Sequence, residues 1–101
     1  MNSKLQDGNV DALFEAILTL KNKEECYAFF DDLCTIAEIK EMSRRLAAAK
    51  MLREKRVYTD IAAETGLSTA TISRVNRCLQ YGNDGYQTVL ERLEQKRGKK
   101  Q

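Results

Sequence analysis

The sequence predicts an all-α fold of about six helices. Proline is absent from its 101 residues, alanine, leucine, glutamate, lysine and arginine are plentiful, and apolar residues recur at helical spacing along most of the chain. The length suits one domain. We therefore expect residues 1–101 to form a single domain, with dimerisation and scaffold helices at 10–56, a two-helix hairpin at 57–80, a C-terminal helix at 84–95 and a basic tail at 96–101.

Two amphipathic helices are predicted near the N-terminus. Apolar residues at helical spacing indicate the first helix over residues 10–20, with Asn9 as its cap. Asn22 followed by Glu25 has the spacing of a capping box and opens the second helix. The apolar members of this second helix are Cys26, Phe29, Phe30 and Leu33.

A longer central helix and a final helix have similar start signals. Thr35 and Glu38 repeat the capping-box spacing, which predicts a helix from Ile36 to about Glu54. We expect it to bury Ile39, Met42, Leu46 and Leu52. Asp84 and Gln87 are expected to cap the last helix, which would bury Tyr86, Val89, Leu90 and Leu93, and the tail after it is expected to be disordered.

Several of these helices are short, and a small chain buries their apolar faces with difficulty. A second copy of the chain would cover those faces. A compact monomer with a small core is the alternative that periodicity alone leaves open.

The stretch "YTDIAAETGLSTATISRV" has the pattern of a helix-turn-helix. Tyr58 to Thr65 makes about two helical turns, and Gly66 can take the left-handed conformation that ends a helix sharply. Leu67 is expected to fill the corner, and Ser68 is a suitable cap for the next helix. That helix, predicted over residues 68–79, has one apolar face made of Ile72, Val75 and Leu79. Thr65 stands where an apolar residue is more usual, so we expect weaker packing there.

The opposite face of the second hairpin helix carries short polar side chains followed by arginines. A helix fits the DNA major groove when its leading side chains are small, and hydroxyl, amide and guanidinium groups then read base edges. A helix N-terminus and its hydroxyl groups can also bind phosphate. The residues predicted to face outward are Thr69, Ala70, Thr71, Ser73, Arg74, Asn76 and Arg77.

Charge is divided unevenly along the chain. Residues 1–42 contain four basic and nine acidic residues, a net charge of −5, whereas residues 43–101 contain thirteen and six, a net charge of +7. The second half is therefore the one expected to meet a polyanion. Within it, the basic residues of the stretch "RRLAAAKMLREKR" do not lie on one helical stripe, and a solvated surface accounts for most of them. Arg53 and Arg56 lead into the hairpin and are predicted to contact the DNA backbone.

Other functional classes find little support in the sequence. Histidine is absent, and Cys26, Cys34 and Cys78 have no C-x-x-C spacing, which argues against a metal site, a disulfide framework and common catalytic dyads. No enzyme activity, metal or cofactor is expected. No apolar run would span a bilayer and no signal peptide is evident, so a cytoplasmic protein is predicted. A protein-interaction module is the main alternative, but its docking helix would expose large apolar anchors.

The stretches "EIKEMSRRLAAAKMLREKRVY" and "TDIAAETGLSTATISRVNRCLQYG" resemble the Trp repressor superfamily, and most closely its YerC/YecD branch. The resemblance covers about residues 10–93. It implies a bacterial transcriptional repressor, an intertwined all-helical homodimer whose two recognition helices enter successive major grooves of double-stranded DNA.

The resemblance also implies a candidate effector pocket. The family clamps a co-repressor between two arginines, which match Arg74 and either Arg45 or Arg44; the pocket threonines match Thr35 and Thr71. Val75 replaces a glycine that leaves room for an indole ring, and Cys78 replaces a serine that binds the ligand, so tryptophan is not the expected ligand. Phosphate contacts or ion pairs are alternative roles for the arginines. The DNA-binding residues predicted overall are Arg53, Arg56, Ser68, Thr69, Ala70, Thr71, Ser73, Arg74, Asn76 and Arg77.

Overall fold

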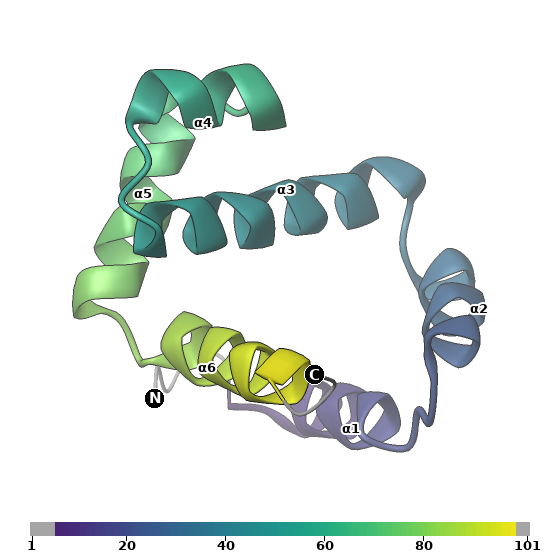
Figure 1. The fold of residues 1–101 in the computed structure, drawn as a ribbon. Coiled ribbons are helices and arrows are strands. Elements are labelled where there is room, and N and C mark those ends of the chain that lie inside the picture. Colours follow the sequence, from purple (N-terminus) through teal and green to yellow (C-terminus); the bar gives the residue numbers. More distant parts are fainter. Residues whose placement is uncertain (1–5, 99–101) are drawn as a thin grey trace. The chain divides into compact units, whose positions relative to one another are not determined.

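The computed structural model describes residues 6–98, which form six α-helices and no strand (Figure 1). The all-α prediction is therefore confirmed. The chain divides into two compact units, Met1–Ile39 and Lys40–Gln101, which we describe separately. No helix of the described part is long and apolar enough to cross a bilayer. The helices are α1 (Gly8–Ile17), α2 (Lys23–Leu33), α3 (Ile36–Arg53), α4 (Tyr58–Thr65), α5 (Thr69–Tyr81) and α6 (Gly85–Gly98).

Helix α1 begins earlier than the sequence predicts. The side chain of Asp7, and not that of Asn9, accepts a hydrogen bond from the Val10 amide at 2.8 Å, and the helix ends at Ile17. A carboxylate satisfies a free amide at a helix start and also interacts well with the positive end of the helix dipole. The predicted cap was therefore two residues late, because Asp7 and Asn9 are both good capping residues.

Helix α2 begins at the predicted capping box. Asn22 Oδ1 accepts from the Glu25 amide at 2.9 Å, while Glu25 Oε1 accepts from the amide of Lys21, one residue before the cap. Neither α1 nor α2 contains a buried residue. Phe14 on α1 is 54% exposed and Leu33 on α2 is 50% exposed, so the apolar faces of these two helices remain partly uncovered within one chain.

Helix α3 starts as predicted and ends in a turn that the sequence does not reveal. Thr35 and Glu38 form a reciprocal capping box, with backbone-to-side-chain distances of 2.8 and 3.1 Å. At the other end, the Arg56 amide donates to Met51 O and the Lys55 amide donates to Leu52 O. This Schellman arrangement places Lys55 in the left-handed region, with a φ of 65°.

The core of the second unit is built around two alanines of α3. Ala48 and Ala49 are fully buried, while the predicted core residues Met42 and Leu46 are 44% and 38% exposed. Small side chains allow a neighbouring helix to approach closely, so burial follows the alanines instead of the larger residues. The core cluster consists of Ala48, Ala49, Ile61, Leu67, Ile72, Val75 and Leu90.

Helix α6 begins differently from the prediction. Asp84 adopts a φ of 63°, and the side chain of Gln87 donates to Leu79 O at 3.3 Å, so the two residues do not form a capping box. Gln87 instead satisfies a carbonyl near the end of α5, which links the two helices. Leu90 is buried, whereas Val89 and Leu93 are 46% and 44% exposed. The predicted tail is helical through Gly98, and its residues 99–101 lie outside the described part of the chain.

Candidate nucleic-acid interface

The turn of the hairpin depends on one glycine. Gly66 follows α4 with a φ of 75°, and its amide donates to Ala62 O at 2.9 Å. A side chain in this left-handed conformation is disfavoured, whereas glycine adopts it freely. The chain can therefore turn sharply within three residues, and α5 begins at Thr69.

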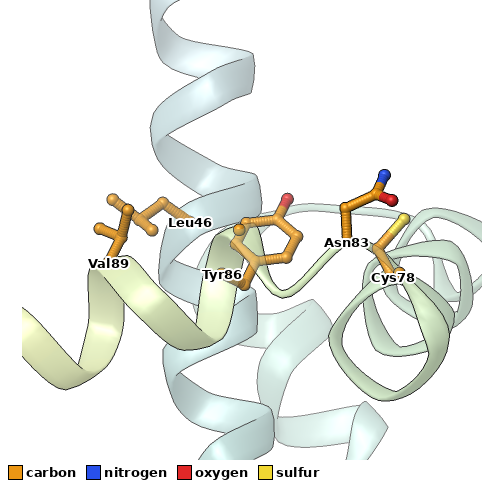
Figure 2. Close-up of a pocket in the computed structure, with 7 residues that line it drawn as sticks. Leu46, Cys78, Asn83, Tyr86 and Val89 are labelled. Atoms are coloured by element: carbon orange, nitrogen blue, oxygen red, sulfur yellow. The ribbon is translucent and has the colours of Figure 1, made fainter. Parts of the chain in front are cut away.

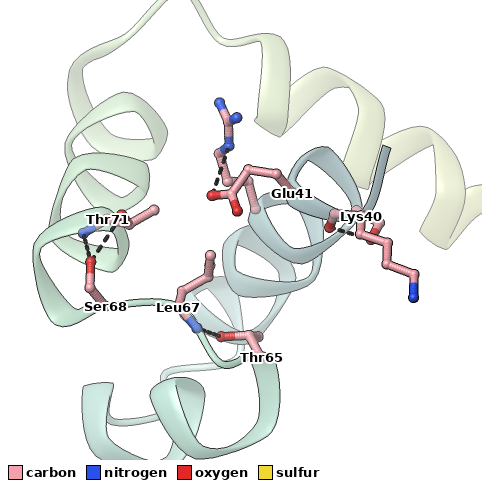
Figure 3. A network of polar contacts seen from close by, with 8 residues as sticks. Lys40, Glu41, Thr65, Leu67, Ser68 and Thr71 are labelled. Atoms are coloured by element: carbon pink, nitrogen blue, oxygen red, sulfur yellow. Dashed lines mark hydrogen bonds and ion pairs between the residues drawn. The ribbon is translucent and has the colours of Figure 1, made fainter. Parts of the chain in front are cut away.

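Thr65 closes this turn with its hydroxyl group. The hydroxyl donates to Ile61 O at 2.7 Å and accepts from the Leu67 amide at 3.2 Å (Figure 3). Thr65 is 9% exposed and Leu67 is 6% exposed, so water has little access to that amide. The hydroxyl therefore has a bonding role that the sequence did not predict, because it satisfies a buried donor that an apolar side chain would leave unpaired.

The second hairpin helix starts at a serine cap. Ser68 Oγ accepts from the Thr71 amide at 3.1 Å and lies 3.0 Å from the Thr71 hydroxyl (Figure 3). This arrangement satisfies one free amide of the first turn and fixes the Thr71 side chain. The first turn of α5 contains no acidic residue, so its remaining amides and positive dipole end are available to an anion.

Helix α5 has one buried face and one exposed polar face. Ile72, Val75 and Leu79 are between 0% and 3% exposed and pack in the interior of the second unit. Thr71 and Asn76 are half-buried at the boundary between the two faces. The exposed side chains are Thr69, Ala70, Ser73, Arg74, Arg77, Cys78, Gln80 and Tyr81. The one large apolar side chain among them, Tyr81, is 86% exposed and is the last residue of the helix. This face can offer hydroxyl, methyl and guanidinium groups to a base edge or to a phosphate.

Both arginines predicted at the hairpin flank form ion pairs. The Arg56 guanidinium holds the Glu64 carboxylate through both of its terminal nitrogens, and this pairing lowers the pKa of Glu64 and raises the pKa of Arg56. Arg53 Nη1 lies 3.5 Å from Glu94 Oε1 on α6 and forms no hydrogen bond with a described residue. Glu64 and Glu94 were not anticipated from the sequence, because pairs eight or more residues apart require the folded chain.

The residues of the candidate effector pocket occupy different environments. Thr35 caps α3 in the first unit, and Arg45 pairs with Glu41 one helical turn earlier at 3.8 Å. Val75 belongs to the core and is 3% exposed. A groove of about 490 Å³ lies beside α5 and α6 (Figure 2). Of the predicted effector residues, only Cys78 lines this groove. The other lining residues are Leu46, Gly82, Asn83, Gly85, Tyr86 and Val89.

Tyr86 lines the same groove as Cys78, one of the candidate effector residues, although its spacing predicted only a core role. Its ring lies between Leu46 and Cys78 in the groove (Figure 2). Burial and the nearby Cys78 raise the pKa of the Tyr86 phenol, while the charges of Arg45 and Arg74 lower it. The described residues contain no group of side chains that could hold a metal ion.

Comparisons with known proteins agree with this architecture. Residues 8–94 match the family model "Trp repressor protein". The chain is 58% identical to the YerC protein of Bacillus subtilis (strain 168) over 92 residues, covering 91% of this chain and 88% of YerC.

Two solved structures are also similar. A TrpR-like protein from Eubacterium eligens has a TM-score of 0.89 and 61% identity, covering 92% of this chain and 96% of the other. A candidate Trp repressor from Staphylococcus aureus has a TM-score of 0.88 and 55% identity, covering 93% and 95% respectively.

Proposed function

Because this chain belongs to the Trp repressor protein family, we propose that it is a homodimeric, sequence-specific DNA-binding repressor of transcription. The family is one of helix-turn-helix regulators, and the described hairpin has the required form. The operator would be nearly two-fold symmetric, since each half-site meets one recognition helix of the dimer.

The outward face of α5 is the observation that carries the proposal. A helix that serves as a docking surface would expose several large apolar anchors, whereas this one exposes small polar residues followed by Arg74 and Arg77, and its one large exposed apolar side chain, Tyr81, is its last residue. Neither arginine forms an ion pair with another described residue, so their charges are available to DNA.

We assign base readout to the start and middle of α5 and backbone contacts to its edges. Small side chains near the helix start let the helix enter the major groove, which is about 12 Å wide. Arg74 can read a base, contact a phosphate or flank an effector. The proposed reading residues are Thr69, Ala70, Thr71, Ser73 and Asn76, and the proposed backbone contacts are Ser68, Arg53, Arg56 and Arg77.

The uncovered apolar faces of the first unit support a dimer. Residues such as Phe14 and Leu18 are more than half exposed in a single chain, and a second copy would bury them. Sedimentation over a wide concentration range tests this assignment. A monomer at micromolar concentration would contradict the dimer but would leave DNA binding by each hairpin possible.

Regulation by a small effector is a separate part of the proposal. The family suggests an amino-acid-like effector, and Arg45 and Arg74 would bind its anionic group near Tyr86. Cys78 is a poor hydrogen-bond partner for an amino group, so we expect an effector other than tryptophan. Calorimetry with amino acids and related anions tests this point, and the absence of heat with all of them would contradict effector control.

The DNA-binding proposal is tested by selecting bound fragments from sheared bacterial genomic DNA. The best fragment and a random duplex of equal length are then titrated at two or more salt concentrations. We expect a symmetric fragment to bind at least 10³-fold more tightly than the random duplex. Equal, weak and strongly salt-dependent binding of both duplexes would contradict sequence-specific regulation and favour an interaction module.

A further inference from the structure

The arginines around the hairpin fall into two groups. Arg74 and Arg77, on the outward face of α5, form no ion pair with another described residue. Arg56 lies in the loop before α4 and is paired with Glu64, which lies near the C-terminal end of α4. The side chains of Arg56 and Glu64 are 32% and 50% exposed, so the pair lies at the surface where DNA could reach it.

The Glu64 carboxylate contacts the Arg56 guanidinium through both of its oxygens, as a phosphate group would. One carboxylate oxygen accepts from Arg56 Nη2, and the other accepts from Nη1 at 3.4 Å. Arginine binds DNA phosphates through the same two parallel donors. A phosphate and the Glu64 carboxylate therefore compete for one guanidinium group.

The loop conformation keeps this pair assembled in the free protein. The left-handed Lys55 and the bonds of residues 55 and 56 to α3 fix the backbone of Arg56. Glu64 is fixed on a helix whose neighbours Ile61 and Thr65 are buried. Because both partners are tethered, the carboxylate has a high effective concentration at Arg56, which a loosely held phosphate cannot match.

We propose that Glu64 is a specificity-determining residue: Arg56 stays paired with Glu64 on DNA of arbitrary sequence and exchanges Glu64 for a backbone phosphate only on the operator. On the operator, base contacts by α5 hold one phosphate in a fixed position beside Arg56. On other sequences the DNA backbone is not held in one register, so no phosphate stays beside Arg56 and Arg56 remains paired with Glu64. Exposed ion pairs are weak enough for this exchange to occur.

The exchange depends on the proposed DNA binding, and salt dependence measures it directly. Each phosphate neutralised adds about 0.9 to the slope of log affinity against log salt concentration. Glu64→Gln frees Arg56, so on random duplex DNA we expect a slope steeper by about 0.9 and binding about fivefold tighter at 0.15 M salt. On the operator the Arg56 contact already exists, and we expect the slope to stay unchanged.

Arg56→Gln gives the reciprocal test. It should lower the operator slope by about 0.9 and leave the random-duplex slope unchanged, since Arg56 contacts phosphate only on the operator. Asp60→Asn is the matched control, because it removes one negative charge from the same helix but leaves the fork intact. Thermal unfolding of each variant shows that the fold is retained.

Three results would overturn the exchange. These are a random-duplex slope for Glu64→Gln equal to that of the wild type, an equal steepening by Asp60→Asn, or an Arg56→Gln effect of the same size on both DNAs. All three results are informative only if the wild type prefers the selected fragment. If the wild type binds every duplex equally, the proposal of sequence-specific DNA binding fails. Failure of that proposal is thereby distinguished from failure of the Arg56–Glu64 exchange.

Discussion

Replacing Thr65 with valine separates two explanations of a polar residue in the hairpin turn. Valine has nearly the same shape as threonine, so core packing is kept while the hydroxyl is lost. The Leu67 amide then has no partner in a site where Leu67 is 6% exposed. An unsatisfied buried donor costs about 1–3 kcal/mol, and we expect Thr65→Val to lower the free energy of unfolding by about that amount.

Thr65→Ser is the matched control for this substitution. Serine keeps both hydrogen bonds but loses one buried methyl group, which costs about 0.8 kcal/mol. Serine should therefore be less damaging than valine if the hydroxyl matters most. If packing mattered most, the order would be reversed and valine would equal or exceed the wild type.

The assay is urea unfolding followed by circular dichroism. All variants are compared at one protein concentration, since the proposed association with a second copy would make the apparent stability depend on concentration. Equal m-values would show that the variants unfold from the same folded state. A Thr65→Val protein at least as stable as the wild type would refute the role given to the Thr65 hydroxyl.

Three further substitutions test other backbone and capping features. In Gly82→Ala the new Cβ would clash with Cys78 O, so the free energy of unfolding measured in urea is expected to fall by about 1–3 kcal/mol. A variant as stable as the wild type would contradict this clash. Lys55 has a φ of 65°, a backbone conformation that glycine adopts more easily. Lys55→Gly is therefore expected to raise the free energy of unfolding by about 0.5–1 kcal/mol, measured by thermal unfolding. A decrease would show that Lys55 is not strained. The Thr35 amide and hydroxyl lower the pKa of Glu38. The stability that the Glu38 carboxylate contributes is present above its unfolded pKa of about 4.3 and is lost as the pH falls through its lower folded pKa. Below pH ~5 the free energy of unfolding of Glu38→Gln should therefore depend less on pH than that of the wild type.

Much of the fold could be predicted because its signals are local. The capping boxes at Asn22 and Thr35, the serine cap at Ser68 and the left-handed Gly66 are all recognised within four residues of sequence, and the structure contains each of them. These positions determine where helices start and end. The helix order was therefore predicted correctly.

The errors occur where two good local signals compete or where a contact is distant. Asp7 and Asn9 both suit a helix start, and only the folded chain selects Asp7. Gln87 could complete a local box, but its side chain instead reaches Leu79 O. Large apolar residues on α3 were expected inside, whereas close helix packing buries Ala48 and Ala49.

The candidate interface shows the same division. The outward face of α5 follows from helical spacing, because buried residues such as Ile72 and Val75 leave the polar residues outside. The state of each charge does not follow from spacing. Arg53 and Arg56 appear in the sequence as free cations beside the hairpin, and their partners Glu94 and Glu64 become visible only in three dimensions.

This pairing changes what the positive charge of the second half means for DNA binding. The net charge of +7 for residues 43–101 counts Arg53 and Arg56 together with the acidic residues that hold them. An approaching phosphate meets these pairs as nearly neutral groups, and it meets Arg74, Arg77 and the N-terminal amides of α5 as uncompensated positive groups. The described ion pairs therefore reduce the positive charge of the arginines that flank the hairpin and leave the charges of Arg74 and Arg77 on α5, the helix that we propose reads the bases, without a described counter-charge.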